Sequence, residues 1–272
     1  MKSRFLVRAS LVLSLATPLY FMAAALGVKF GLWDWRVGLG TLIVEWGPRL
    51  LAAALVLAVI ATIAMLLQRP RRGLPLALIA LLIPTAGLNY LYQVRERSKT
   101  LPPIHDVSTN AEDPPVHSPR IAEARAAAGA NPVHPLTAEL SSMEAYQTPR
   151  FADQGDRTVG ELGRQAYPQL RPLIVSAQRE RLFAVLAQEA DERGWTIVTN
   201  DPAAGRLEAV AETFWFGFRD DVAVRIRPAP GAGRLVVDAR STSRVGLGDL
   251  GANAARLTAY LQAVEEELRS NE

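Results

Sequence analysis

Residues 206–243 read RLEAVAETFWFGFRDDVAVRIRPAPGAGRLVVDARSTS, and this stretch decides the fold of the C-terminal half. Apolar and polar residues alternate in three runs, as they do in half-buried strands. We place these strands at Arg206–Phe214, Asp221–Arg227 and Arg234–Ser243. The Pro- and Gly-containing segment 228–233 makes the turn between the last two. Upstream, Trp195–Asn200 reads as a fourth strand, so the sequence predicts a four-stranded antiparallel sheet.

A helix is predicted on each side of these strands. The first begins after a Ser176 cap and stops at Gly194, and its apolar residues recur every three or four positions. The second runs from near Asp249 to about Arg269 with one apolar stripe. The order helix, four strands, helix predicts a two-layer α+β domain with both helices on one face of the sheet, and it is similar to the helix-grip arrangement.

The stretch 213–256, which contains Phe-Trp-Phe-Gly-Phe-Arg-Asp-Asp and Ser-Thr-Ser-Arg-Val-Gly-Leu-Gly-Asp, closely resembles family 1499 of the domains of unknown function (DUF1499). The resemblance extends from about Ile104 to the end of the chain. It implies a domain of bacterial and plastid proteins, and it implies no particular activity. It also implies that the Pro- and Ala-rich segment from Ile104 onward lies ordered along the domain surface.

Three apolar segments in the N-terminal half are each about 20 residues long, enough to cross a bilayer as helices. They are Ala9–Val28, Pro48–Leu67 and Leu74–Val94. A cleaved signal peptide is the alternative for the first segment. We therefore divide the chain into a membrane domain (1–94), a linker and domain-edge segment (95–172) and an extracytoplasmic α+β domain (173–272).

Charge supports an orientation with the N-terminus in the cytoplasm. Residues 1–94 carry nine basic and two acidic side chains, and basic residues precede the first span and separate the second from the third. An odd number of spans then leaves the C-terminal domain outside the cytoplasm of a bacterial inner membrane. Arg95, Arg97 and Lys99 would lie on the outer side and argue weakly against this. Trp33, Trp35 and Trp46 are expected in the first outer loop, at the membrane interface.

Composition excludes several classes of function. The part of the chain after residue 94 has 21 basic and 25 acidic residues, so it lacks the basic surface of a nucleic-acid-binding protein. The absence of cysteine excludes thiolate metal sites, thiol nucleophiles and disulfides. The histidines (His105, His117 and His134) lack metal-ligand spacing. We expect no metal, no cofactor and no catalytic residue set.

Alternation places Glu208, Glu212, Arg225, Arg227, Asp238 and Arg240 on the sheet face opposite the helices. The simpler interpretation is a solvent-exposed face with weak cross-strand ion pairs. The alternative is an arginine-lined surface, including Arg225 and Arg240, for an anionic head group or an acidic partner.

The aromatic segment Phe214, Trp215, Phe216 and Phe218 precedes Arg219, Asp220 and Asp221. Four rings within five residues cannot all enter a core by simple alternation. One interpretation is a hairpin tip whose rings fold under the helices, and the other is an exposed tip that faces the membrane or a partner. Asp220 and Asp221 are interpreted as a solvated turn, with a cation or acid–base pair as the alternative.

The loop before the last helix contains Ser241, Thr242, Ser243, Arg244 and two glycines. It suits an anion at the helix N-terminus, where Arg244 would add charge. Against this, Asp249 as N-cap would occupy the same backbone amides. A structural connection is therefore favoured, and Asn253 and Arg256, predicted off the apolar stripe, would bond back to this loop or extend the site.

These features predict a non-enzymatic envelope protein whose domain binds a protein partner or an amphipathic ligand. Two alternatives stay open. One is a carrier that holds a lipid tail between sheet and helices. The other is a hydrolase or transferase on envelope lipids that uses Asp220, Asp221 or Asp249 with Arg225, Arg240 and Arg244.

Overall fold

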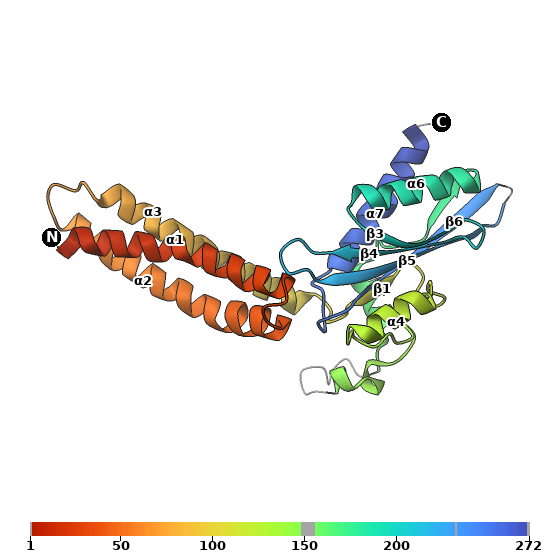
Figure 1. Ribbon diagram of the computed structural model, residues 1–272, viewed down its shortest axis with the longest axis horizontal. Helices are drawn as coiled ribbons and strands as arrows, with labels where there is room; N and C mark the ends of the chain where they lie inside the picture. Colours follow the sequence, from red (N-terminus) through yellow and green to blue (C-terminus); the bar gives the residue numbers. More distant parts are fainter. Residues whose placement is uncertain (1, 148–155, 232, 271–272) are drawn as a thin grey trace. The chain divides into compact units, whose positions relative to one another are not determined.

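The computed structural model of the chain describes residues 2–147, 156–231 and 233–270 (Figure 1). Its contacts divide the chain into two compact units. The first consists of residues 1–99 together with Thr213–Gly217, and the second of residues 100–212 and 218–272.

Three helices of the first unit are long and apolar enough to cross a membrane, as the sequence predicts. They are α1 (Lys2–Lys29), the continuous helix formed by the π-helix η1 (Arg36–Trp46) and α2 (Gly47–Leu66), and α3 (Leu74–Thr100). The second therefore begins earlier than expected, and Trp46 lies in a helix rather than in a loop. The apolar run from Leu39 to Val44 accounts for this early start.

Small residues lie at the contacts among these three helices. Ala54, Ala58 and Ala80 are fully buried, and the Ser14 hydroxyl donates a hydrogen bond of 2.7 Å to the carbonyl of Ala80. Close backbone approach and a few interhelical hydrogen bonds are the usual basis of helix packing in lipid.

The second unit contains an antiparallel sheet of six strands, and the expectation of four was wrong. The strands follow the order β1-β6-β5-β4-β3, and β2 also pairs with β6. Their bounds are β1 Asp106–Ser108, β2 Leu173–Ser176, β3 Thr196–Asp201, β4 Arg206–Glu212, β5 Arg219–Pro228 and β6 Arg234–Ser243. The two additional strands, β1 and β2, have three and four residues, which is too short for an alternating pattern to show.

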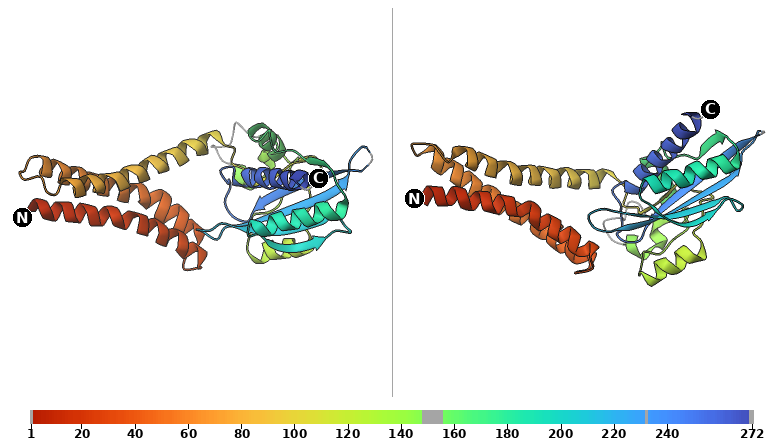
Figure 2. Two further views of the ribbon diagram at one scale, coloured as in Figure 1. Left: turned by 90° about the horizontal axis from the view of Figure 1, so that it is seen from above. Right: turned by 45° about the horizontal axis from the view of Figure 1, so that its top comes forward.

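Two helices cover one face of this sheet, as predicted, and a third lies on the opposite side (Figures 1 and 2). The covering pair is α6 (Arg179–Glu192) and α7 (Ala252–Ser270), and α4 (Pro119–Ala127) is on the other side. The remaining elements are short: α5 (Val159–Ala166), η2 (Leu140–Ser142) and η3 (Glu144–Tyr146). Gln178, not Ser176, precedes α6, because Ser176 ends β2. Gly194 ends this helix with φ +68°.

The main core fills the space between α6, α7 and the sheet. Leu207 pairs with Val224 and Ala209 with Val222, so their side chains point to the same face. Against them pack side chains that are fully buried: Leu182, Leu186, Leu257 and Tyr260. The centres of the Tyr260 and Trp195 rings are 4.8 Å apart. The Tyr260 hydroxyl donates a hydrogen bond to the Leu186 carbonyl at 2.8 Å.

Replacing Leu257 by Ala should lower the free energy of unfolding by about 2–5 kcal/mol, because it leaves a cavity under α7. Gln262→Ala, an exposed change on the same helix, should change it by less than about 0.5 kcal/mol. Denaturant unfolding of the full chain in detergent, followed by tryptophan emission, measures both. Equal midpoints for the two variants would contradict the position of α7.

Candidate functional site

The polar face of the sheet is covered by the chain segment 104–135, and the expectation of a solvated face was wrong. Glu208 and Asp238 have no exposed surface, and Arg240 is 4% exposed. Glu208 accepts hydrogen bonds from the backbone N–H of Ser118 at 2.6 Å and from the Thr199 hydroxyl at 2.8 Å. A charged face under a protein layer requires a partner for every charge.

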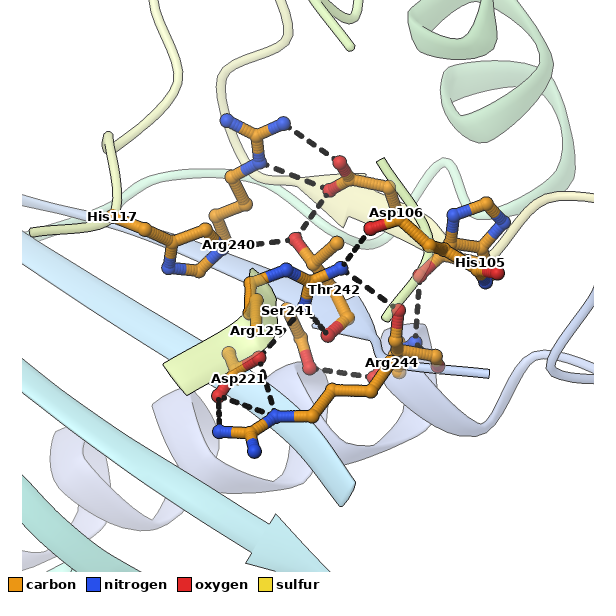
Figure 3. A network of polar contacts seen from close by, with 12 residues as sticks. His105, Asp106, His117, Arg125, Asp221, Arg240, Ser241, Thr242 and Arg244 are labelled. Atoms are coloured by element: carbon orange, nitrogen blue, oxygen red, sulfur yellow. Dashed lines mark hydrogen bonds and ion pairs between the residues drawn. The ribbon is translucent and has the colours of Figure 1, made fainter. Parts of the chain in front are cut away.

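Asp221 is held under this cover by two arginines, Arg125 and Arg244 (Figure 3). One oxygen, Oδ2, accepts from Arg125 Nη1 at 2.6 Å. Arg244 binds both oxygens, with Nη2 at 2.7 Å from Oδ1 and Nε at 3.0 Å from Oδ2. The Arg125 guanidinium also donates to the backbone carbonyls of Asn131, Thr242 and Ser243. Asp221 thus joins α4 to β5 and to the chain after β6, and it is not the solvated turn predicted from the sequence.

Asp106 of β1 makes the second buried carboxylate contact. Its oxygens accept from Arg240 Nε at 3.0 Å and Nη2 at 2.7 Å, which is the strong two-bond geometry of a guanidinium and a carboxylate. The Thr242 hydroxyl donates to the same carboxylate at 2.9 Å. We call Asp106, His117, Arg125, Asp221, Arg240, Thr242 and Arg244 the cover network. It contains three guanidinium groups and two carboxylates.

His117 completes the cover network as a neutral side chain. Its Nε2 lies 3.1 Å from the Thr242 hydroxyl. That hydroxyl has one proton, which it gives to Asp106, so His117 Nε2 must be the donor. Nδ1 is therefore unprotonated, and it is buried without a hydrogen-bond partner among the described residues. Burial, followed by the charge of Arg240, lowers the pKa of His117 to about 4.

A second group of charges lies farther along the same face. Asp238 accepts from Arg225 Nη2 at 2.9 Å and from Arg227 Nε at 2.6 Å. Arg225 also binds Asp113, at 2.9 Å, in the covering segment. Arg225 therefore lies between two carboxylates. Because its charge is already paired, it is a poor candidate for binding an anionic head group.

Further polar contacts lie on the helix side, around the start of α7. Arg256 Nη2 is 2.6 Å from Asp220 Oδ2. The side chain of Asn253 is fully buried, accepts from the Ser241 hydroxyl at 2.6 Å and donates to the Ser243 hydroxyl at 2.8 Å. Asn253 is thus buried rather than off the apolar stripe, and Asp220, like Asp221, is buried in β5.

Asp249 occupies the amides at the beginning of α7. Its carboxylate accepts from the backbone N–H of Gly251 and of Asn253, each at 2.8 Å. These contacts support the interpretation of the loop as a structural connection. Burial raises the pKa of Asp249, and its two backbone hydrogen bonds oppose that rise. Leu250 beside it has φ +54°, a strained conformation for a residue other than glycine.

The aromatic segment contains both exposed and half-buried rings. Phe214 is 72% exposed and Trp215 46%, and the two rings meet edge to face at 5.1 Å. Phe216 and Phe218 are half-buried. Arg219 pairs with Glu212 across the two strands at 3.1 Å on the surface. The exposed rings and the buried charges are therefore separate features of the hairpin formed by β4 and β5.

The arrangement of charges favours structural roles over chemistry. Most charged candidates (Asp220, Asp221, Arg225, Arg240, Arg244 and Arg256) have a partner of opposite charge inside the domain. No group of three or more His, Asp or Glu side chains in the described ranges could hold a metal ion. His105 is half-buried; Nδ1 lies 3.2 Å from the Leu247 carbonyl, and burial lowers its pKa.

The partners that neutralise the candidate residues are not predicted by the sequence pattern. Asp106, His117 and Arg125 all come from the segment read as a linker and domain edge, more than 95 residues before the strands they contact. The short helix α4 in this segment is followed by Gly129, with φ +58°. Arg125 on α4 does not by itself identify Asp221 as its partner.

Asp221→Asn should lower the free energy of unfolding by about 3–5 kcal/mol, because two buried guanidinium groups lose their counter-charge. Glu212→Gln, at the exposed pair with Arg219, should cost at most about 1 kcal/mol. Denaturant unfolding of the full chain measures both. A loss for Asp221→Asn no larger than for its control would show that the buried contacts contribute little.

Stability should also fall as the pH is lowered from about 6.5 to about 4. His117 binds a proton in the unfolded chain at its ordinary pKa of 6.5 but in the folded chain only near 4, so acid favours the unfolded chain. The His117→Gln variant lacks this titration. Between these two pH values its free energy of unfolding should therefore fall by up to about 3 kcal/mol less than that of the wild type. His105 acts in the same direction in both proteins, so the difference between them isolates His117. Parallel pH curves would contradict a buried neutral histidine.

Comparison with known proteins is informative at the level of the family. The family model described as "Protein of unknown function (DUF1499)" matches residues 106–264, a range that begins at β1 and ends within α7. A search of the curated proteins finds no match. The match covers more than half of the chain and includes the buried contacts around Asp106 and Asp221, and the chain belongs to the DUF1499 family.

Proposed function

We propose that the protein is a non-enzymatic binding or assembly module of the bacterial cell envelope, held at the inner membrane by its three apolar helices. One observation carries this proposal: the aspartates and arginines that a catalytic site would need are engaged in ion pairs and hydrogen bonds within the domain. A general acid or base must reach a substrate proton, and Asp221 has both oxygens occupied by guanidinium groups.

The proposed orientation places the N-terminus in the cytoplasm and the α+β domain outside it. Arg4 and Arg8 lie near the start of α1, and Arg69, Arg71 and Arg72 lie between α2 and α3. Basic residues of this kind are enriched in short cytoplasmic segments. A domain on the outer side without cysteine depends on its hydrophobic core for stability, and its buried ion pairs fix the arrangement of its strands, which suits a rigid binding module.

The packing disfavours the lipid carrier. The space between sheet and helices holds fully buried side chains such as Leu182, Leu207 and Leu257, which a lipid tail would have to displace. A cavity beside β1 and α5, lined by Asp106, Gly160 and Tyr167 among others, has a volume of about 10 Å³. That is room for about one water molecule.

The enzyme alternative reduces to Asp249, the candidate aspartate whose pKa is raised. Asp249→Asn removes its acid–base chemistry but keeps a residue that caps helices equally well, so stability should fall by no more than about 1 kcal/mol. If the protein is a binding module, this variant should replace the wild type fully in a strain that lacks the chromosomal gene. A folded variant at wild-type abundance that fails to do so would favour catalysis through Asp249.

Native mass spectrometry of the full chain, extracted gently from its own membrane, tests binding directly. We expect a polypeptide to be released with it in a fixed ratio, and the Asp249→Asn variant should retain that polypeptide. Stable addition of one lipid mass instead would support the carrier. Release of the bare protein under conditions that preserve other membrane complexes would argue against a stable assembly.

A further inference from the structure

Phe214 and Trp215 form an exposed apolar surface that the folding of the domain does not require. The core between sheet and helices is complete without these rings, which are 72% and 46% exposed. They lie in Thr213–Gly217, which is most of the short connection between β4 and β5 and in which Gly217 adopts φ +65°. Clustered exposed aromatic residues usually mark a contact with another molecule or with a membrane.

Contacts group this connection with the apolar helices rather than with the sheet. Within that unit, the ammonium group of Lys29 donates to the Phe214 carbonyl at 2.8 Å and lies 5.0 Å from the centre of the Phe214 ring. Lys29 is the last residue of α1. The charged end of an apolar helix marks the level at which the chain leaves the hydrocarbon.

Other aromatic residues follow α1 in the same unit and are paired with cations in the same way. Arg36 lies 4.7 Å from the Trp35 ring, and Arg49 lies 5.3 Å from the Trp46 ring. Trp and Tyr are enriched at the boundary between lipid head groups and acyl chains, where an apolar ring and a polar edge are both accommodated. Lys29 and the Phe214 ring form a pair of the same kind, and the Trp215 ring packs against Phe214.

We propose that Phe214 and Trp215 insert at the boundary between lipid head groups and acyl chains, on the membrane surface where α1 ends. Area favours lipid over a protein partner: two rings bury about 150–250 Å² each, whereas a stable protein interface needs about 800 Å² on each side. Weak insertion suffices here, because the helices already hold the segment at high effective concentration near the membrane.

The chain has no cysteine, so a single introduced cysteine labels one position without further change. Trp215→Cys carries a nitroxide at the proposed insertion point, and Ala203→Cys carries it at the exposed β3–β4 turn as the matched control. The full chain is reconstituted alone in vesicles of phosphatidylethanolamine and phosphatidylglycerol. Collision of the nitroxide with oxygen, which partitions into lipid, is compared with collision with a water-soluble nickel complex.

At position 215 we expect the ratio of oxygen to nickel collisions to exceed that at position 203 several-fold. Equal ratios would place the ring in water and overturn the proposal. Low accessibility to both reagents at 215 would also overturn it, because the label would then be covered by protein. Since no other protein is present, failure here leaves the proposed binding module untouched, and failure to release a partner in mass spectrometry leaves the insertion untouched.

A measurement without a label covers the case in which the cysteine itself disturbs the segment. Brominated lipids quench tryptophans that reach the acyl chains, and the difference in emission between wild type and Trp215→Phe isolates Trp215 from the other four tryptophans. We expect that difference to be lost in brominated vesicles. A difference that brominated lipid leaves unchanged would overturn the proposal.

Discussion

The buried carboxylate of Asp221, held by Arg125 from one side and by Arg244 from the other, is the interaction on which the domain depends. It lies in a central strand of the sheet, and its partners come from a helix on the polar face and from the chain that leads into the last loop. An isolated charge at this depth would be too costly to bury, so strand, helix and loop must be in place together. The second pair, Asp106 with Arg240, fastens β1 to β6 in the same way.

Charge inside a small domain is a poor source of net stability but a good source of specificity. Replacing a buried ion pair by apolar side chains is often neutral or stabilising, whereas removing one partner is strongly destabilising. A shift of β1 by one residue along β6 would turn Asp106 away from Arg240 and leave both charges buried and unpaired. The cover network therefore fixes the register of a strand that is only three residues long and has almost no pattern of its own.

The sequence was most informative where periodicity was long. The β6 strand has the predicted bounds, and α6 and α7 lie together on one sheet face because their apolar residues recur at helical spacing. The short strands β1 and β2 were missed, since three or four residues show no alternation. The ion-pair partners of the candidate arginines were harder to predict than the strands. Arg225 and Arg240 were candidates, but their carboxylate partners Asp113 and Asp106 lie more than 100 residues away in the chain, and a single sequence does not show such pairs.

The distance along the chain between β1 and β6 has a consequence for how the protein is made. Asp106 and Arg240 are separated by 134 residues, so the first strand of the domain has no partner until nearly all of the chain has been synthesised. At about 5–20 residues per second, that delay is roughly 7–27 s. During this time the segment that carries Asp106 and Arg125 is a solvated, charged chain rather than an apolar one, which limits premature association. The charges that fix the register in the folded domain therefore also keep the segment that carries Asp106 and Arg125 soluble until β6 has been synthesised.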